Sequence, residues 1–321
     1  MRAFVTGATG FVGGRLARKL RDRQDDVVAL VRSPSKATEI RELGCELVEG
    51  DLSDEEAVRK AVVGCEAVFH VAAMYEVGIP TSKKPAMYEA NVKGTERVID
   101  AAVDAAVPRI VYVSTVGIFG DTQGKVVDET YQREPTGYMS YYEETKYLAH
   151  QIALDRATKG APIVIVQPGG IYGPGDPSLL GLMMNLVRKG WLRFNLMPRS
   201  GFNWVHVDDV ADGIILAHDK GRVGESYILG GEMATLKEAI ARISMLSGRR
   251  PPRVTVPDPL LRVGIPFGPI IGRLTSFPPN MREMLGNVGA TFYATDDKAR
   301  RELGYSPRDL DTGLTETLAA V

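Results

Sequence analysis

The sequence has little cysteine and no long apolar run. Cys45 and Cys65 are its only two cysteines, which excludes a disulfide framework, and neither has a partner at metal-ligand spacing. No window reaches the roughly 18 uncharged apolar residues of a membrane span, and the opening MRAFVTGATG lacks the apolar core of a signal peptide. These absences predict a cytoplasmic protein without a transmembrane segment or a bound metal.

An excess of charge of one sign is missing as well. Lys and Arg number 39 against 40 Asp and Glu, so the net charge is -1. This balance gives no support to a nucleic-acid surface or a polybasic membrane anchor. The hydrophobic share of 44% and the length of 321 residues are typical of a globular protein with one large domain or two smaller ones.

A glycine-rich turn follows the first apolar run. Residues 2–6, RAFVT, have the composition of a strand, and GRLARKLRDR at 14–23 has the pattern of a helix. Between them, Gly7 permits a tight turn, Gly10 lets the backbone approach a pyrophosphate, and Gly13 allows close helix packing. The predicted nucleotide contacts are Thr6, Gly7, Thr9, Gly10, Phe11, Val12 and Gly13. Because the spacing is G-x-x-G-x-x-G, a purely structural turn is the alternative.

The ends of the next two predicted strands suggest which dinucleotide binds. No carboxylate follows VVALVR at 27–32, and Arg32 and Lys36 are placed to hold a ribose 2′-phosphate. We therefore favour NADP over NAD, although both cations could be solvated loop residues. Asp51 and Leu52 end the third strand and are placed for the adenine.

Further apolar strands alternate with amphipathic helices along the first half of the chain. This order predicts an α/β fold with a Rossmann-type, doubly wound parallel sheet and a smaller C-terminal substrate-binding lobe. We expect residues 1–167 to form the dinucleotide domain, with 202–229 returning to it, and 168–201 with 230–321 to form the lobe. Ligands bind beyond the carboxyl ends of such strands. Those ends carry Val71, Ala72, Ala73, Ser114, Thr115, Pro168, Gly169 and Gly170. The small residues among them could also reflect tight packing.

The stretch SYYEETK at 140–146 places two tyrosines before a lysine. Groups four apart on a helix lie about 40° from each other, so Tyr142 and Lys146 share a face if this stretch is helical. Tyr141 diverges from Lys146 by about 140° on the same geometry. The alternative is an ordinary amphipathic helix with a core aromatic and a solvated lysine.

Taken together, these motifs resemble the extended short-chain dehydrogenase/reductase family. The matching stretches are TGATGFVG at 6, DL at 51, HVAA at 70, NVKGT at 91, VYVST at 111, YEETK at 142, PGGIYGPGD at 168, NWVHVDDVA at 203 and DDKARRELGYSPR at 296. The resemblance implies a nicotinamide cofactor and a catalytic Tyr142, Lys146 and Thr115, with Ser114 adjacent and Asn91 in support. Lys146 would lower the pKa of Tyr142 and bond the nicotinamide ribose. Tyr142 would then exchange a proton with a carbonyl oxygen that Thr115 holds.

Within that family, the style of PGGIYGPGD and FNWVHVDDVADG is closer to the dihydroflavonol-reductase and 3β-hydroxysteroid-dehydrogenase branch. Sugar-nucleotide epimerases and dehydratases often carry an arginine and an asparagine before YGP, where this chain has Gln167 and Gly170. We expect a hydrophobic ketone or alcohol as substrate. The alternatives are a sugar-nucleotide epimerase or dehydratase and a non-catalytic dinucleotide sensor. Candidates for an apolar lining, or for ordinary core, are Leu179, Leu182, Met183, Met184, Phe194 and Trp204.

Several further expectations concern the surface and the second half of the chain. The proline-interrupted stretch 259–277 is a poor membrane span, and we expect a lid there, with peripheral lipid contact as the alternative. A dimer is common in the family, and we expect a homodimer here, through the helices that include 86–106 and 138–158. His70 and His206 are expected to be structural, and Asp208 and Asp209 to cap a helix.

Overall fold

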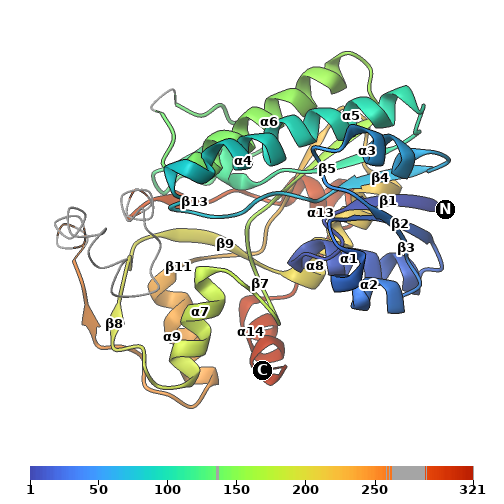
Figure 1. The fold of residues 1–321 in the computed structure, drawn as a ribbon. Helices are drawn as coiled ribbons and strands as arrows, with labels where there is room; N and C mark the ends of the chain where they lie inside the picture. Colours follow the sequence, from blue (N-terminus) through green and yellow to red (C-terminus); the bar gives the residue numbers. More distant parts are fainter. Residues whose placement is uncertain (135–136, 258, 260, 262–285, 287, 321) are drawn as a thin grey trace.

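The computed structural model describes residues 1–134, 137–257, 259, 261, 286 and 288–320. Its centre is a seven-stranded sheet with the order β10-β6-β5-β4-β1-β2-β3, in which all neighbouring strands are parallel (Figure 1). The strands are β1 (Arg2–Thr6), β2 (Asp26–Val31), β3 (Glu46–Glu49), β4 (Ala67–His70), β5 (Ile110–Val113), β6 (Ile163–Pro168) and β10 (Ser226–Leu229). This arrangement confirms the predicted α/β fold with a doubly wound parallel sheet.

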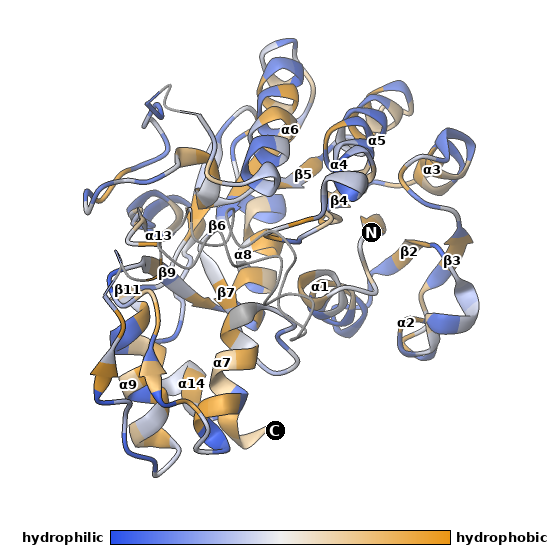
Figure 2. Cartoon of the chain, turned by 60° about the vertical axis from the view of Figure 1, so that its left-hand side comes forward, coloured by the Kyte–Doolittle hydropathy of each residue, from blue (hydrophilic) through white to orange (hydrophobic). Residues whose placement is uncertain are grey.

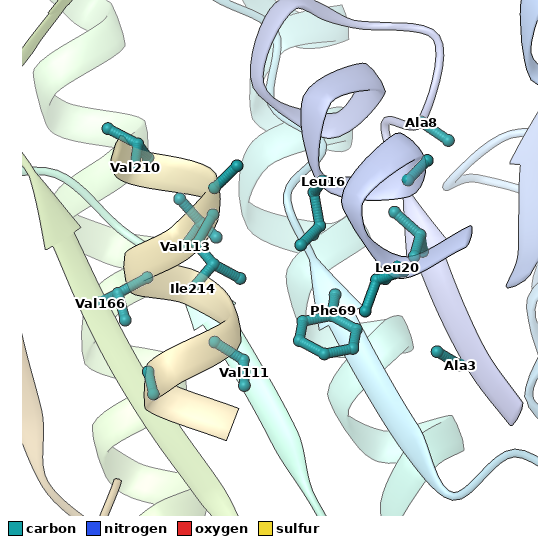
Figure 3. Close-up of a cluster of buried hydrophobic side chains, with 14 of the residues drawn as sticks. Ala3, Ala8, Leu16, Leu20, Phe69, Val111, Val113, Val166, Val210 and Ile214 are labelled. Atoms are coloured by element: carbon teal, nitrogen blue, oxygen red, sulfur yellow. The ribbon is translucent and has the colours of Figure 1, made fainter. Parts of the chain in front are cut away.

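Helices cover both faces of the sheet because successive side chains of each buried strand point to opposite sides. One face carries α1 (Phe11–Asp22), α2 (Thr38–Glu42), α8 (Val207–Lys220) and α13 (Asp297–Leu303). Figure 3 shows Leu16 and Leu20 of α1 and Ile214 of α8 meeting the side chains of the strands. The other face carries α3 (Glu55–Val62), α5 (Gly94–Asp104) and α6 (Tyr141–Thr158). The sheet is thereby enclosed, and its carboxyl ends remain as the place for a ligand.

Short helical segments lie in the connections of this half. They are η1 (Pro34–Lys36), η2 (Thr81–Lys83), α4 (Lys84–Tyr88), η3 (Glu89–Lys93) and η4 (Val116–Phe119). Segment η3 is a turn of π-helix inserted between α4 and α5. Such insertions are rare and frequently occur at functional sites.

A second, smaller body of structure is built on a sheet of order β11-β9-β13, with β7 also paired to β9. Its strands are β7 (Gly170–Tyr172), β9 (Gly201–His206), β11 (Glu232–Thr235) and β13 (Thr291–Phe292), and β8 (Phe194–Asn195) pairs separately with β12 (Val254–Thr255). Helices α7 (Leu179–Arg188), α9 (Leu236–Leu246) and α14 (Leu310–Ala319) complete it. Met183, Met184 and Trp204 belong to the core of this part, so they have the ordinary packing role.

Some predictions for the second half of the chain stay predictions. Within 202–229, β9 lies in the smaller sheet, whereas α8 and β10 lie with the large one. The division into a dinucleotide domain and a substrate-binding lobe stays a prediction. The expected lid at 259–277 falls, apart from Pro259 and Leu261, outside the described residues. Among the described residues, no helix has both the length and the apolar character needed to cross a membrane.

Candidate active site

The glycine turn between β1 and α1 leaves no room for side chains. Gly7 has a φ of +74°, and a Cβ there would lie 2.9 Å from the backbone of Ala72. A Cβ on Gly13 would lie 2.1 Å from the carbonyl oxygen of Gly7. Gly10 is the N-cap of α1, no side chain caps that helix, and its first turn holds no acidic residue. The first-turn amides, which include those of Phe11 and Val12, therefore form a positive helix end that fits a pyrophosphate.

Thr6 ties this turn to the end of β4. Its buried hydroxyl oxygen accepts hydrogen bonds from the amides of Val71 and Ala72, both at 3.1 Å. Because those lone pairs are occupied, the hydroxyl donates to Nδ1 of His70 at 2.8 Å. Through these hydrogen bonds, Thr6 holds the Val71–Ala72 backbone beside the glycine turn. Thr9, in the glycine turn, and Ala73, directly after Ala72, are exposed.

Arg32 and Asp51 lie near one another at the ends of adjacent strands. Hydrogen bonds from the hydroxyl and amide of Ser53 lower the pKa of Asp51, and Arg32 contributes less to that shift. Arg32 and Lys36 are exposed, and Arg32 forms no ion pair with any residue that the structure describes. Leu52 packs on Gly94, where a Cβ would lie 2.8 Å from the Cβ of Leu52. The ends of β2 and β3 therefore carry the exposed cations Arg32 and Lys36 and the packed apolar side chain of Leu52.

A chain of buried hydrogen bonds runs from His70 toward the π-helical turn. The hydroxyl of Thr95 donates to the carbonyl of Asn91 at 2.7 Å, so Nε2–H of His70 donates to Thr95 at 2.9 Å. Burial, and then the charge of Lys146, lowers the pKa of His70 to about 3. His70 is consequently a neutral structural residue, and it connects β4 to η3.

Asn91 in η3 joins two segments that flank the predicted catalytic residues. Its side-chain oxygen accepts a hydrogen bond from the amide of Met74 at 2.7 Å, and its Nδ2 donates one to the carbonyl of Met74 at 3.0 Å. Its Nδ2 also donates to the hydroxyl of Thr145 at 3.0 Å, and that hydroxyl donates to the carbonyl of Tyr142 at 2.9 Å. Asn91 is 2% exposed. The family-derived expectation of a supporting asparagine thus has a geometry that fits it.

The start of α6 is fixed by a cap and an ion pair. Ser140 accepts a hydrogen bond from the amide of Glu143, and the carboxylate of Glu143 accepts one from the amide of Met139. The same carboxylate pairs with Arg133 at 2.9 Å, with both side chains almost buried. These contacts therefore fix the backbone of the first turn of α6, in which Tyr142 is the second residue.

Tyr142 and Lys146 lie one turn apart on α6, as the spacing predicts. Nζ of Lys146 donates to the carbonyl of Val113 at 2.9 Å and lies 5.1 Å from the ring centre of Tyr112. Burial lowers the pKa of Lys146 to about 7. Burial, followed by Tyr75 and Tyr112, raises the pKa of Tyr142, which is opposite to the shift that the resemblance implied. The reason is that the lysine amine bonds to β5, while the phenol is desolvated among other phenols.

The two hydroxyls after β5 have different surroundings. Ser114 is buried and pairs with Nδ1 of His150 on α6 at 3.0 Å. The oxygen of Thr115 accepts a hydrogen bond from the amide of Gly117 at 3.1 Å, which leaves its proton free to be donated. Of the two, Thr115 is the one able to hold a ligand oxygen.

Pro168, Gly169 and Gly170 lie where β6 passes into β7. A Cβ on Gly169 would lie 2.3 Å from the carbonyl oxygen of Asn203, so the chain crosses between the two sheets at close range. Gln167 is 1% exposed, and its side-chain oxygen has no hydrogen-bond partner among the described residues. This corner lies at the carboxyl end of β6, the edge at which ligands bind in such sheets.

Sequence reasoning missed two residues: Tyr75, which lies beside Tyr142, and Asp176, which lies near Tyr75. The ring of Tyr75 meets that of Tyr142 edge to face, with 4.9 Å between ring centres, and 58% of the Tyr75 surface is exposed. Partial burial, and then the carboxylate of Asp176, raises the pKa of Tyr75. One oxygen of Asp176 accepts from the amide of Ser178, and the other is buried without a partner among the described residues. The sequence shows only that Tyr75 follows the β4 strand and that Asp176 ends the GPGD stretch. The contacts of Tyr75 with Tyr142 and with Asp176 depend on tertiary structure.

Comparisons with known proteins agree with this geometry. The model of the NAD dependent epimerase/dehydratase family matches residues 3–230. A protein of Synechocystis sp. named "Putative dihydroflavonol 4-reductase" is 33% identical over 98% of this chain and 93% of its own length. The 4-hydroxy-2-methyl-3-oxo-4-farnesyl-3,4-dihydroquinoline-1-oxide ketoreductase of Stigmatella aurantiaca is 32% identical over 96% of this chain and 92% of its own. The crystal structure of gox2253 superposes with a TM-score of 0.85 at 36% identity, covering 99% of this chain and 97% of the other.

The matched segment includes the glycine turn, Asn91, Thr115, Tyr142 and Lys146. The relatives cover nearly the whole chain and are named as reductases, which supports the branch inferred from the motifs. The chain therefore belongs to the NAD dependent epimerase/dehydratase family, within the extended short-chain dehydrogenase/reductases, and is an NAD(P)-dependent oxidoreductase.

Proposed function

We propose that the protein is an NADP-dependent reductase that transfers a hydride between the nicotinamide and a hydrophobic ketone or secondary alcohol, with Tyr142 as general acid or base. One observation carries the proposal. The hydroxyl of half-buried Tyr142 bonds to no described residue, whereas its backbone carbonyl is held by Thr145, which Asn91 bonds in turn. A phenol that is held firmly but left unpaired is suited to bonding a ligand oxygen.

The donor set fits the cofactor. The amides at the start of α1 would hold the pyrophosphate, Arg32 and Lys36 the 2′-phosphate, and Leu52 the adenine. Lys146 and the Pro168–Gly170 corner would lie toward the nicotinamide end. When bound, a nicotinamide cofactor supplies or accepts the hydride.

The protein's own part in reduction is to place a proton. As the carbonyl carbon gains a hydride, its oxygen gains the proton of the Tyr142 hydroxyl and becomes the hydroxyl of a secondary alcohol. The raised pKa of Tyr142 keeps that proton in place through the neutral range. Thr115 donates a hydrogen bond to the same oxygen and stabilises its developing charge.

Three observations support a hydrophobic substrate. The exposed ring of Tyr75 stands against Tyr142 and offers an apolar wall. A Cβ on Gly170 would lie 3.3 Å from both Phe202 and Trp204, so an asparagine there, as in many sugar-nucleotide enzymes, would be crowded. The ketoreductase relative of Stigmatella aurantiaca is named for a farnesylated, and hence hydrophobic, ketone.

A sugar-nucleotide epimerase or dehydratase is the second candidate, because the matched family is named for those activities. The two candidates differ in cofactor use, since an epimerase regenerates its cofactor in each turnover. The decisive experiment is to incubate the protein with NADPH and a panel of hydrophobic ketones, and in parallel with NAD and nucleoside-diphosphate sugars. We expect loss of NADPH absorbance with a ketone. Sugar conversion without net cofactor consumption, and no ketone reduction, would assign the epimerase class instead.

Cofactor preference has its own test. Replacing Arg32 by Ala should weaken NADPH binding by about tenfold and leave NADH binding nearly unchanged, because only NADPH carries the 2′-phosphate. Arg18→Ala, on the exposed side of α1, is the matched control. Equal losses for both nucleotides would contradict the assignment of Arg32.

A further inference from the structure

A hollow of about 460 Å³ lies at the far end of the smaller lobe, between α7, α9 and the β8–β12 pair. In Figure 1 these elements lie together at the lower left, away from α1 and α2, and Figure 2 shows hydrophilic stretches of chain near the ends of α7 and α9. Its lining includes Arg193, Arg249, Arg250 and Arg253, and no carboxylate. We call this surface, with the neighbouring Trp191, Phe194 and Val254, the arginine tip.

The positive charge of the arginine tip is uncompensated within the described structure. Segments 179–201 and 239–257 contain eight basic residues and no acidic one, which leaves 31 basic against 40 acidic residues in the rest of the chain. One of the eight, Arg242, lies outside the arginine tip and pairs with Glu232 and Asp311. None of the four lining arginines forms an ion pair with a residue that the structure describes. Like charges gathered around one hollow repel each other and attract an anion. The balanced net charge of the whole chain conceals this local excess.

Exposed apolar side chains surround the same cations. Phe194 and Val254 are register partners in the β8–β12 pair and are 50% and 54% exposed, so they stand side by side on one face. Trp191 is 66% exposed, and the ammonium of Lys189 lies 5.3 Å from its ring centre. Cations interleaved with exposed aromatic and aliphatic groups are typical of surfaces that bind the lipid–water interface.

We propose that the arginine tip docks on a bilayer that contains anionic phospholipid. The lining arginines bind headgroup phosphates, and Trp191 and Phe194 enter the interfacial layer. A bilayer fits better than a nucleic acid because it touches only this end of the molecule, whereas a longer polyanion would also meet the net acidic remainder. If the proposed function holds, docking brings the lobe expected to bind the substrate to a source of hydrophobic ketones, but the docking itself does not depend on that function.

The test is co-sedimentation of the full chain with vesicles of phosphatidylcholine alone or mixed with phosphatidylglycerol, at low and high salt. We expect binding to the anionic vesicles only, weakened by salt. Arg250→Glu combined with Arg253→Glu should reduce the partition coefficient by at least about tenfold. Lys60→Glu with Lys125→Glu makes the same charge change on exposed residues elsewhere and should bind much more strongly than the tip variant.

Three outcomes would overturn the proposal. These are no binding of the wild type to anionic vesicles, equal losses for the tip variant and its control, and tighter binding of a single-stranded oligonucleotide than of the vesicles. NADPH binding by each variant verifies that it is folded. A variant that fails to bind vesicles but reduces a soluble ketone normally would separate docking from the proposed function.

Discussion

The side-chain amide of Asn91 donates to the hydroxyl of Thr145 at 3.0 Å, and this hydrogen bond joins the π-helical turn to the helix that carries Tyr142. Thr145 in turn bonds the carbonyl of Tyr142 at 2.9 Å. On the other side, Asn91 holds Met74, which precedes Tyr75 in the chain. One buried amide therefore sets the positions of both tyrosines of the proposed site.

Replacing Asn91 by Ala should destabilise the protein by about 2 to 3 kcal/mol, because it leaves buried polar groups unpaired. It should also lower kcat more than it raises KM, since the position of the acid is disturbed. Denaturant unfolding and ketone-reduction kinetics measure the two effects. Asn185→Ala, at an exposed position of α7, is the control and should change stability by less than about 1 kcal/mol. An active, stable Asn91→Ala protein would remove Asn91 from the account.

Two adjacent glycines of α1 should differ sharply in their tolerance of a methyl group. Gly13→Ala places a Cβ 2.1 Å from the carbonyl oxygen of Gly7, so it must distort the turn and weaken nucleotide binding. Gly14→Ala meets its nearest atom, the carbonyl oxygen of Ala8, at 3.4 Å, and should be neutral or stabilising by up to about 1 kcal/mol through helix propensity. Thermal unfolding and titration with NADPH distinguish them. Similar behaviour of the two variants would contradict the close-packed turn.

The buried lysine makes a prediction about pH. Burial lowers the pKa of Lys146 to about 7 from its ordinary value of 10.5, so between these values the folded protein has released a proton that the unfolded chain still binds. Stability from this group should therefore rise with pH across that window, by up to about 1.4 kcal/mol per pH unit. Lys146→Met should remove this rise. Urea unfolding of both proteins from pH 6 to about 10 gives the difference, and parallel curves would show that the lysine titrates alike in both states.

Features that depend on neighbours in the sequence could be predicted. The strand, glycine turn and helix at 2–22 follow from composition and spacing alone, as does the placement of Tyr142 and Lys146 on one helix. The alternation of apolar and helical segments was sufficient for the parallel sheet. The capping prediction failed because His206, not Asp208 or Asp209, caps α8 with its side chain, and Asp209 instead pairs with Arg308 at 2.9 Å.

Features that depend on tertiary contacts could not be predicted from the sequence. No spacing rule brings Tyr75 to Tyr142 or Asp176 to Tyr75, because loops far apart in the sequence supply Tyr75 and Asp176. The pKa of Tyr142 was predicted in the wrong direction because burial cannot be read from a Y-x-x-x-K motif. The arginine tip was missed for a similar reason, since nearly equal numbers of basic and acidic residues say nothing about where those charges lie on the surface.

The most direct test of the central claim is the rate of NADPH oxidation by a Tyr142→Phe protein with an accepted ketone. Phe keeps the ring that packs on Tyr75 and removes only the hydroxyl. The parallel variant Tyr141→Phe keeps the ring that lies 4.7 Å from the ammonium of Lys84 and should be fully active. We predict that Tyr142→Phe binds NADPH like the wild type but loses at least about 100-fold in kcat. Reduction of the ketone at the wild-type rate by this protein would contradict the account.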